Sequence, residues 1–228
     1  MFQLYDKLLQ FPLFQGLGYT DLKQIVAHTK FDFKKFASGE TIVRDGDNCK
    51  HLYMLTDGTF EISATASEKR YTVKETSKAP AMFQMEHLFG LNQQFSCHYK
   101  ALSACSLILI DKNELMWLAE TFMVFRMNLL NILTTQVQKT EKLIWSQAPD
   151  NTEGLVIQFL IDRCRIPTGP KQFFILMNQL AKELNDSRLN ISNALNHLQQ
   201  LDYIRLHRGR IEIPEIATLQ KSFHASSD

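Results

Sequence analysis

The spacing of hydrophobic residues divides the chain into stretches of different secondary structure. From Met1 to Phe31, apolar residues recur three or four positions apart, which predicts short helices. From Asp32 to Ile110 the period shortens toward two, and turn residues such as Asp45-Gly46-Asp47 interrupt it. Several short strands at this spacing are typical of a β-sandwich or a barrel-like roll. We therefore expect an α+β protein in which residues 1–111 form a β-roll domain.

A stretch free of glycine and proline follows, and it predicts one helix from Lys112 to Ser146. Within it, one set of positions alternates spacings of three and four, as in the seam of a coiled coil: Leu130, Leu133, Val137, Thr140 and Ile144. The same helix of a second copy would satisfy this seam, so residues 112–148 are predicted to form a homodimer. Alternatively, the stripe packs only on the chain's own β-roll.

Ala148-Pro149-Asp150-Asn151 ends the helix and predicts a hinge before a C-terminal domain, residues 149–228. Two helices are expected there, at about Leu176–Leu184 and Arg188–Leu201, joined by a short turn. Ser187 precedes the second helix and is a good N-cap, because its hydroxyl can accept a hydrogen bond from a first-turn amide. The segment Tyr203–Ile213 then predicts a β-hairpin with a cationic tip.

The outward face of the second helix is polar and rich in hydrogen-bonding groups. Arginine and asparagine offer donors and acceptors in fixed directions, as the base edges of the major groove require. Between Ser187 and Arg210, four arginines against one aspartate give a local charge of +3, which suits phosphate contacts. The pattern predicts binding to double-stranded DNA; the alternative is a solvated surface helix and an ordinary hairpin. The arginines are Arg188, Arg205, Arg208 and Arg210, and the outward helix residues are Arg188, Asn190, Asn193, Asn196 and His197.

Composition narrows the class of protein. Lys and Arg number 25 against 24 Asp and Glu, which argues against a protein that coats nucleic acid non-specifically. Four scattered cysteines without a C-x-x-C pair disfavour a zinc ribbon or a thioredoxin-like site, and reduced thiols in a cytoplasm are the simpler interpretation. The N-terminus is a poor signal peptide, and no run approaches the roughly 18 to 20 apolar residues that span a membrane.

The chain carries no phosphate-binding loop, nucleophile elbow or H-E-x-x-H motif, so no catalytic or metal-binding residue is predicted. Two carboxylates in the β-rich stretch, Glu68 and Glu75, are expected to be solvated in a loop or hairpin.

Three short segments match a helix-turn-helix of the form E-[IL]-[AG] … S-R-E-T-[VI]-x-R-x-[LI]. They are Gln179-Leu180-Ala181, Ser187-Arg188 and Ile191–Leu195. With the β-roll turns, including Leu52–Gly58, and the hinge at Asn151–Gly154, the whole chain resembles the family of the cyclic-AMP receptor protein and FNR (CRP/FNR). The resemblance implies a bacterial transcription regulator with a winged helix-turn-helix, in which an effector in the β-roll shifts the dimer helices. It further implies contact with RNA polymerase, which family members make at the position of the loop Pro167–Phe174.

By this resemblance Arg188 is the arginine that reads guanine. The family's next reader, a glutamate, is Leu189 here, and its second arginine is Asn193. Leucine can contact a thymine methyl and asparagine favours adenine, so we expect a palindromic operator that keeps a guanine but is otherwise richer in A and T than TGTGA. The predicted DNA-binding residues are Ser187, Arg188, Leu189, Asn190, Asn193, His197, Arg208 and Arg210.

The family's cyclic-nucleotide cassette falls on Met85–Gly90 and Phe95–Cys97. Glu86 and Ser96 match the glutamate and the serine of this cassette. Phe95 stands where the family has its arginine, and Met85 where it has its glycine. A buried phosphate left unpaired beside Phe95 would cost several kcal/mol. The sensor is therefore predicted not to use cyclic AMP, and to take a more apolar effector or none. On the dimer helix, Thr140 matches a base-contacting threonine, but its neighbour is Glu141 instead of serine. The predicted effector pocket comprises Glu86, His87, Phe95, Ser96, Thr140 and Glu141.

Three alternatives stay open. The regulator could respond to cyclic AMP after all, or it could bind haem through one of four histidines: His28, His51, His87 or His98. It could also be a β-roll regulatory module without DNA activity. An FNR-type iron–sulfur cluster is disfavoured because no cysteine precedes Cys49.

Overall fold

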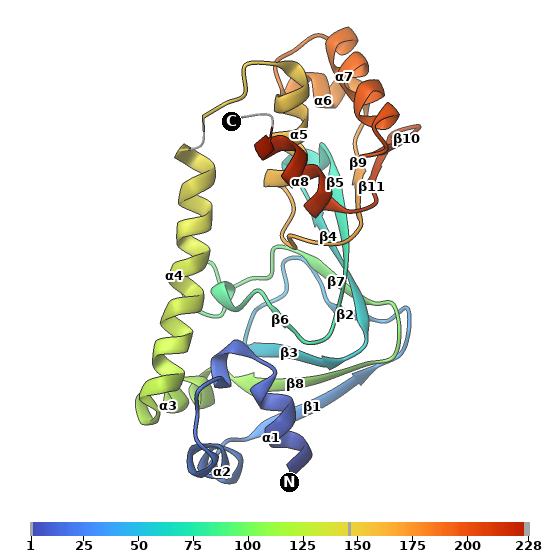
Figure 1. Ribbon diagram of the computed structural model, residues 1–228. Coiled ribbons are helices and arrows are strands. Elements are labelled where there is room, and N and C mark those ends of the chain that lie inside the picture. The colour runs from blue at the N-terminus through green and yellow to red at the C-terminus, as the bar shows by residue number, and fades with distance from the viewer. Residues whose placement is uncertain (1, 146, 226–228) are drawn as a thin grey trace. The chain divides into compact units, whose positions relative to one another are not determined.

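The computed structural model divides into two compact units, Met1–Phe60 with Lys78–Trp145, and Glu61–Ser77 with Ser146–Asp228 (Figure 1). It describes residues 2–145 and 147–225. Met1, Ser146 and residues 226–228, which the predicted segments include, lie outside the described residues. No described helix is both long and apolar enough to cross a membrane.

The first unit begins with the short helices predicted for its N-terminus and continues as a β-roll. One four-stranded sheet has the order β1-β8-β3-β6, and β2 pairs with β7. Alternation along β3 buries Leu52 and Met54, and the neighbouring β8 is buried through most of its length, so this sheet supplies much of the core. The elements are α1 (Phe2–Leu9), a 3₁₀ turn (Pro12–Phe14), α2 (Tyr19–His28), β1 (Phe31–Phe36), β2 (Thr41–Val43), β3 (His51–Asp57), β6 (Ala81–Phe83), η3 (Met85–His87), β7 (His98–Ala101) and β8 (Cys105–Asp111).

The helical stretch that ends this unit is two helices, α3 (Lys112–Thr121) and α4 (Met123–Trp145), and not the single helix predicted. The break lies at Phe122, whose backbone is extended at φ −115° and ψ 107°. The Phe122 ring is buried and meets Trp117 edge-on at 5.8 Å between centroids. The helix is therefore interrupted where this ring is buried, although no glycine or proline lies there.

In the second unit, helices pack against one sheet whose strands run in the order β10-β11-β9-β5-β4. Its core is formed by apolar residues of the sheet and of α5, α6 and α7, including Phe159, Phe173 and Leu195. The elements are β4 (Thr59–Thr65), a 3₁₀ turn (Ser67–Lys69), β5 (Thr72–Lys78), α5 (Thr152–Asp162), β9 (Lys171–Phe174), α6 (Met177–Glu183), α7 (Arg188–Gln200), β10 (Arg205–His207), β11 (Arg210–Ile213) and α8 (Ile216–Ala225). The two predicted helices and the hairpin are thus present within one or two residues of their expected ends.

In the structure, residues Glu61–Ser77 of the predicted β-roll domain group with the C-terminal residues, because β5 pairs with β9. Two expectations for this region are wrong. For the same reason Pro167–Phe174 is not all loop, since Lys171–Phe174 forms a strand between β5 and β11. Glu68 is exposed as expected, but Glu75 is 2% exposed and bound to Lys171.

Candidate functional site

The helix pair α6–α7 presents the predicted DNA-binding face. Ile191, Leu195 and Leu198 are buried against the core, and this fixes which side of α7 faces outward. The Ser187 hydroxyl accepts a hydrogen bond from the backbone amide of Asn190 at 3.1 Å, which confirms the predicted N-cap. Every predicted contact residue from Ser187 to His197 is exposed: Ser187, Arg188, Leu189, Asn190, Asn193 and His197.

A carboxylate that the sequence analysis did not single out holds the start of α7. Asp186 accepts from the side chain of Asn190 at 2.8 Å, from the Ser187 amide at 2.6 Å and from the Thr152 hydroxyl at 2.5 Å. These hydrogen bonds, that from Thr152 first, lower the pKa of Asp186. One amide hydrogen of Asn190 is thereby engaged within the protein. The signal for this role was the position of Asp186 directly before an N-cap serine.

Acidic residues also pair with the other predicted contacts of this face. His197 Nδ1 lies 2.6 Å from Glu153 on α5. In the β10–β11 hairpin, Glu212 lies 3.1 Å from both Arg210 Nη2 and His207 Nε2. The local excess of positive charge is therefore smaller than the sequence count suggested, and Arg210 is only partly available.

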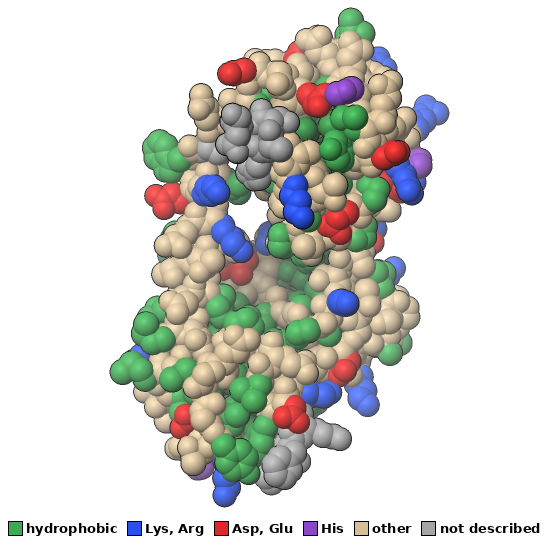
Figure 2. All heavy atoms as spheres, viewed as in Figure 1, with side chains coloured by type: hydrophobic (Ala, Val, Ile, Leu, Met, Phe, Trp, Pro, Cys, Tyr) green, Lys and Arg blue, Asp and Glu red, His purple; other side chains and the backbone are tan. Residues whose placement is uncertain are grey.

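Arg208 and Arg205 are the exposed arginines of this hairpin. Figure 2 shows Lys and Arg side chains projecting beside β10 and β11. Gly209 follows Arg208 with φ +71°, a conformation that glycine adopts without strain, and it closes the turn between His207 and Arg210. The turn chemistry therefore places the exposed Arg208 guanidinium at the tip.

In the first unit, the position of the family's phosphate-binding arginine lies inside the core. Phe95 is 1% exposed and meets Tyr53 and Tyr99 edge-on, at 5.5 and 6.4 Å between ring centroids. Its backbone holds the predicted turn at Gly46, because Gly46 N donates to Phe95 O at 2.8 Å and Phe95 N donates to Asp47 O at 2.9 Å. Phe95 thus serves packing.

The polar groups beside Phe95 bind one another. Gln84, which the sequence analysis did not single out, donates to Ser96 Oγ at 2.6 Å and accepts from Ser96 N at 3.1 Å. Gln84 has φ +33°, so the left-handed backbone lies one residue before Met85, where the family glycine was matched. His87 Nε2 lies 3.5 Å from Ser96 Oγ, and Glu86 is exposed.

These residues do not fit a cyclic nucleotide bound in the family's manner. Phe95 offers no charge to a phosphate, and the Ser96 hydroxyl oxygen already accepts a hydrogen bond from the Gln84 side chain. The charged groups Glu86 and Lys112 both act on the buried thiol of Cys49, whose pKa is raised to about 11 mainly by burial. Lys112 donates to Gln93 at 3.1 Å and lies over the Phe89 ring.

The predicted adenine contacts and dimer seam lie on α4. Thr140 donates back to Gln136 O at 3.1 Å, and Thr140 and Glu141 are both exposed. Figure 2 shows hydrophobic side chains on the outer side of this helix. The large exposed ones are Met123, Val124, Met127, Leu130, Val137, Leu143, Ile144 and Trp145, whereas Leu133 is half-buried.

The described histidines do not gather into a metal site with other possible ligands. Among the residues that the structure describes, no group of three or more His, Cys, Asp or Glu side chains could hold a metal ion. His28 Nδ1 lies 3.0 Å from Gln24 O and its ring stacks on Trp117. His51 meets Tyr53 edge-on.

Comparison with known proteins agrees with this architecture. Residues 33–122 match the cyclic nucleotide-binding domain. The global nitrogen regulator of Synechococcus elongatus is 23% identical over 201 residues, 83% of this chain and 89% of that protein. The catabolite activator protein of Thermus thermophilus superposes with a TM-score of 0.50 at 20% identity, covering 94% of this chain and 99% of the other. The sensor domain of the regulator DNR from Pseudomonas aeruginosa gives 0.52 at 17% identity, covering 64% of this chain and 97% of that domain.

At these identities the solved structures establish the fold, an α+β protein with a cyclic-nucleotide-binding β-roll. The curated relative adds that a protein alignable over most of this chain is a regulator. Residues 33–122 are therefore similar to the cyclic nucleotide-binding domain, and the resemblance of the chain to CRP/FNR transcription regulators that its sequence indicated is confirmed.

Proposed function

We propose that this chain is a cytoplasmic, bacterial, homodimeric transcription regulator that binds a palindromic operator and does not respond to cyclic AMP. The α6–α7 pair and the β10–β11 hairpin form a winged helix-turn-helix, in which α7 enters the major groove and Arg208 contacts phosphate. The observation that carries the proposal is the exposed polar face of α7, fixed by its buried opposite face and its Ser187 cap.

Leu189 and Asn193 are exposed, as is Arg188, and they support the predicted shift in base preference. The leucine side chain has no polar atom that could pair with a base, whereas the asparagine amide can both donate a hydrogen bond to adenine and accept one from it. The domain boundaries proposed for this function are a sensor, a dimerisation helix α4 and a DNA-binding domain that includes Glu61–Ser77. RNA polymerase remains a proposed partner.

The test is selection of operator DNA from a random library by the purified protein, with and without cyclic AMP. We expect tight binding to two half-sites one helical turn apart, unchanged by cyclic AMP, because Phe95 cannot pair with its phosphate. Recovery of TGTGA half-sites would contradict the proposed base preference. Binding that requires cyclic AMP would contradict the pocket assignment. Another cation would then have to neutralise the phosphate, and Lys112, whose charge acts on Cys49 together with that of Glu86, would be the first residue to substitute.

Replacing Arg188 by alanine is expected to weaken binding to the selected operator about 5- to 150-fold for each half-site, equivalent to about 1–3 kcal/mol for each lost contact. It should also remove the preference for guanine at one position of each half-site. Competition against operators with each base at that position measures both effects. Gln200→Ala, at the exposed far end of the same helix, serves as the control. An R188A protein that still prefers guanine would show that another residue reads it.

A further inference from the structure

The hairpin of β4 and β5 contributes a strand to the sheet that carries the proposed wing. β5 pairs with β9: Thr72 lies opposite Phe174 at one end of the ladder, and Glu75 lies opposite Lys171 at the other. The other edge of β9 pairs with β11. We call the strands β5, β9, β11 and β10 the wing sheet. Val73, opposite Phe173, is 2% exposed and belongs to the same core cluster as residues of α5, α6 and α7. The hairpin is thus built into the DNA-binding unit.

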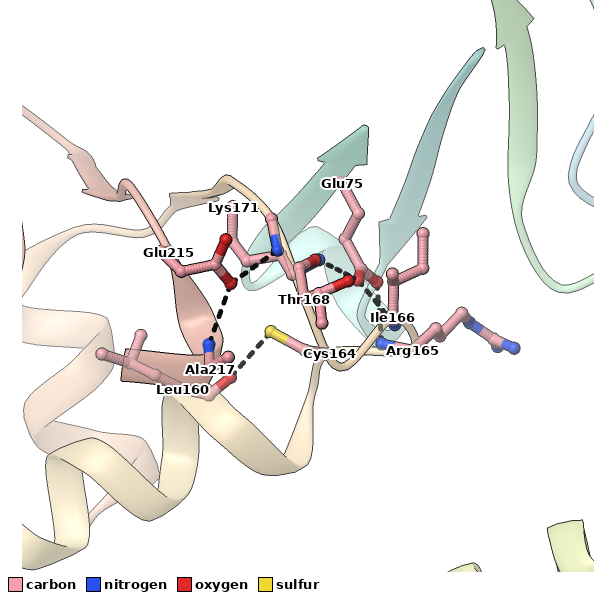
Figure 3. A network of polar contacts seen from close by, with 10 residues as sticks. Glu75, Leu160, Cys164, Arg165, Ile166, Thr168, Lys171, Glu215 and Ala217 are labelled. Atoms are coloured by element: carbon pink, nitrogen blue, oxygen red, sulfur yellow. Dashed lines mark hydrogen bonds and ion pairs between the residues drawn. The ribbon is translucent and has the colours of Figure 1, made fainter. Parts of the chain in front are cut away.

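A buried ion pair joins β5 to β9 (Figure 3). Glu75 Oε2 lies 3.1 Å from Lys171 Nζ, and the two side chains are 1% and 0% exposed. Lys171 also donates to Thr168 O at 2.7 Å. The carboxylate accepts from the backbone amides of Arg165 and Ile166 at 2.8 and 2.9 Å. Removing either partner would leave a charge without its counterion in the protein interior, which is strongly unfavourable.

The tip of the hairpin makes a second set of contacts within this unit. The Arg163 guanidinium lies 3.7 Å from the centroid of the Phe159 ring and donates to the Tyr71 hydroxyl at 2.7 Å. Arg70 Nη1 lies 2.6 Å from Glu183, the last residue of α6. The hairpin therefore contacts α5 and the helix that precedes α7.

Cys164 lies beside this network (Figure 3). Cys164 donates to Leu160 O at 3.1 Å. Burial, followed by the charge of Glu75, raises the pKa of its thiol to about 12. The thiol is therefore protonated at neutral pH and is a poor nucleophile.

We propose that the β4–β5 hairpin is an obligatory strand of the wing sheet and that Glu75 and Lys171 are positioning residues for the wing. This inference rests on the proposed DNA-binding function. Residues 61–77 lie inside the segment that matches the cyclic nucleotide-binding domain, so a piece of the sensor's own chain holds Arg208 in place through β5, β9 and β11. A change in the sensor that moves this hairpin would move the wing.

The DNA test compares Glu75→Gln with Glu61→Gln in the full chain. Glu61 pairs with Lys74 on the same hairpin, but this pair is partly exposed and is expected to matter little. With the wing displaced, Glu75→Gln should lower the slope of log Kd against log salt by about two for the dimer, because one phosphate contact is lost from each protomer. Arg208→Ala should do the same in the wild type and add nothing to Glu75→Gln. Loss of folded protein alone would not change this slope. A wild-type slope in E75Q together with a lowered slope in R208A would overturn the proposal.

A second measurement is independent of DNA and of any variant. In the wild type, amide hydrogens of β5 are expected to exchange as slowly as those of β9 and β11, because the strands open together. Exchange of β5 more than tenfold faster than β9 would show a detachable hairpin and overturn the proposal. If no DNA is selected by the wild type, the proposed function fails, while slow exchange of β5 would still support the strand pairing.

Discussion

Replacing Val137 and Ile144 together by glutamate is expected to turn the proposed dimer into monomers. Both side chains lie on α4 and are 64% and 69% exposed, although they are large and apolar. They occupy equivalent positions of the predicted seam, one heptad apart. In a parallel pair of helices, each substitution would bring two carboxylates together in the interface and desolvate them without a partner.

Loss of the dimer should also remove most of the affinity for operator DNA. A dimer holds its second DNA-binding domain at a high local concentration over the second half-site, which gives about 10²- to 10⁴-fold in affinity. Sedimentation velocity measures the mass of the protein, and a mobility-shift titration measures the affinity.

The matched control for this variant carries the same added charge on another side of α4. Thr135→Glu with Gln138→Glu introduces two carboxylates at exposed positions outside the seam. This control is expected to remain a dimer and to bind the operator. If V137E/I144E sediments as a dimer, the seam lies elsewhere, and the exposed apolar residues near Met123 and Met127 become the alternative interface.

Local features of the fold could be predicted from the sequence because short-range physics produces them. The period of Ile191, Leu195 and Leu198 sets the buried face of α7, and the hydroxyl of Ser187 caps it within one turn. A glycine with positive φ closes the hairpin at Gly209. For each of these features, the residues that decide the structure are neighbours in the sequence.

Features that depend on distant pairing could not be predicted in this way. Glu75 is a charged residue in a strand, which ordinarily indicates a solvated position. Its partners, Arg165 and Lys171, lie about 90 residues further along the chain, and no periodicity connects them. The role of Gln84 was missed because it depends on Ser96, 12 residues further along the chain. The break at Phe122 was missed because burial of its ring accompanies it, without a glycine or proline.

The site shows the same division. Substitution of the family arginine by Phe95 predicted the loss of a phosphate partner. The sequence did not show that the ring would pack into the core against Tyr53 and Tyr99, or that Gln84 would engage Ser96. On the DNA side, the exposed face of α7 was predicted, whereas the acids that pair with His197 and Arg210, Glu153 and Glu212, come from outside the interval that was counted.

Replacing Phe95 by alanine is expected to lower the free energy of unfolding of the β-roll by about 3–5 kcal/mol, the usual cost of deleting a fully buried aromatic ring. The ring is 1% exposed and lies among other aromatic residues, so its removal would leave a cavity that the surrounding strands cannot fill without moving. Urea denaturation followed by near-ultraviolet circular dichroism measures the loss. Phe33→Ala removes the same ring from β1, where it is 65% exposed, and should cost little.

The F95A protein also separates the two explanations for insensitivity to cyclic AMP. If Phe95 only blocks the pocket, removing the ring should open it, and cyclic AMP should raise the unfolding midpoint of F95A. If the missing charge is decisive, as we expect, cyclic AMP should stabilise neither protein, because alanine supplies no cation for the phosphate. Equal stability of F95A and F33A would contradict the packing role itself, and would mean that the Phe95 position is free to accept an effector.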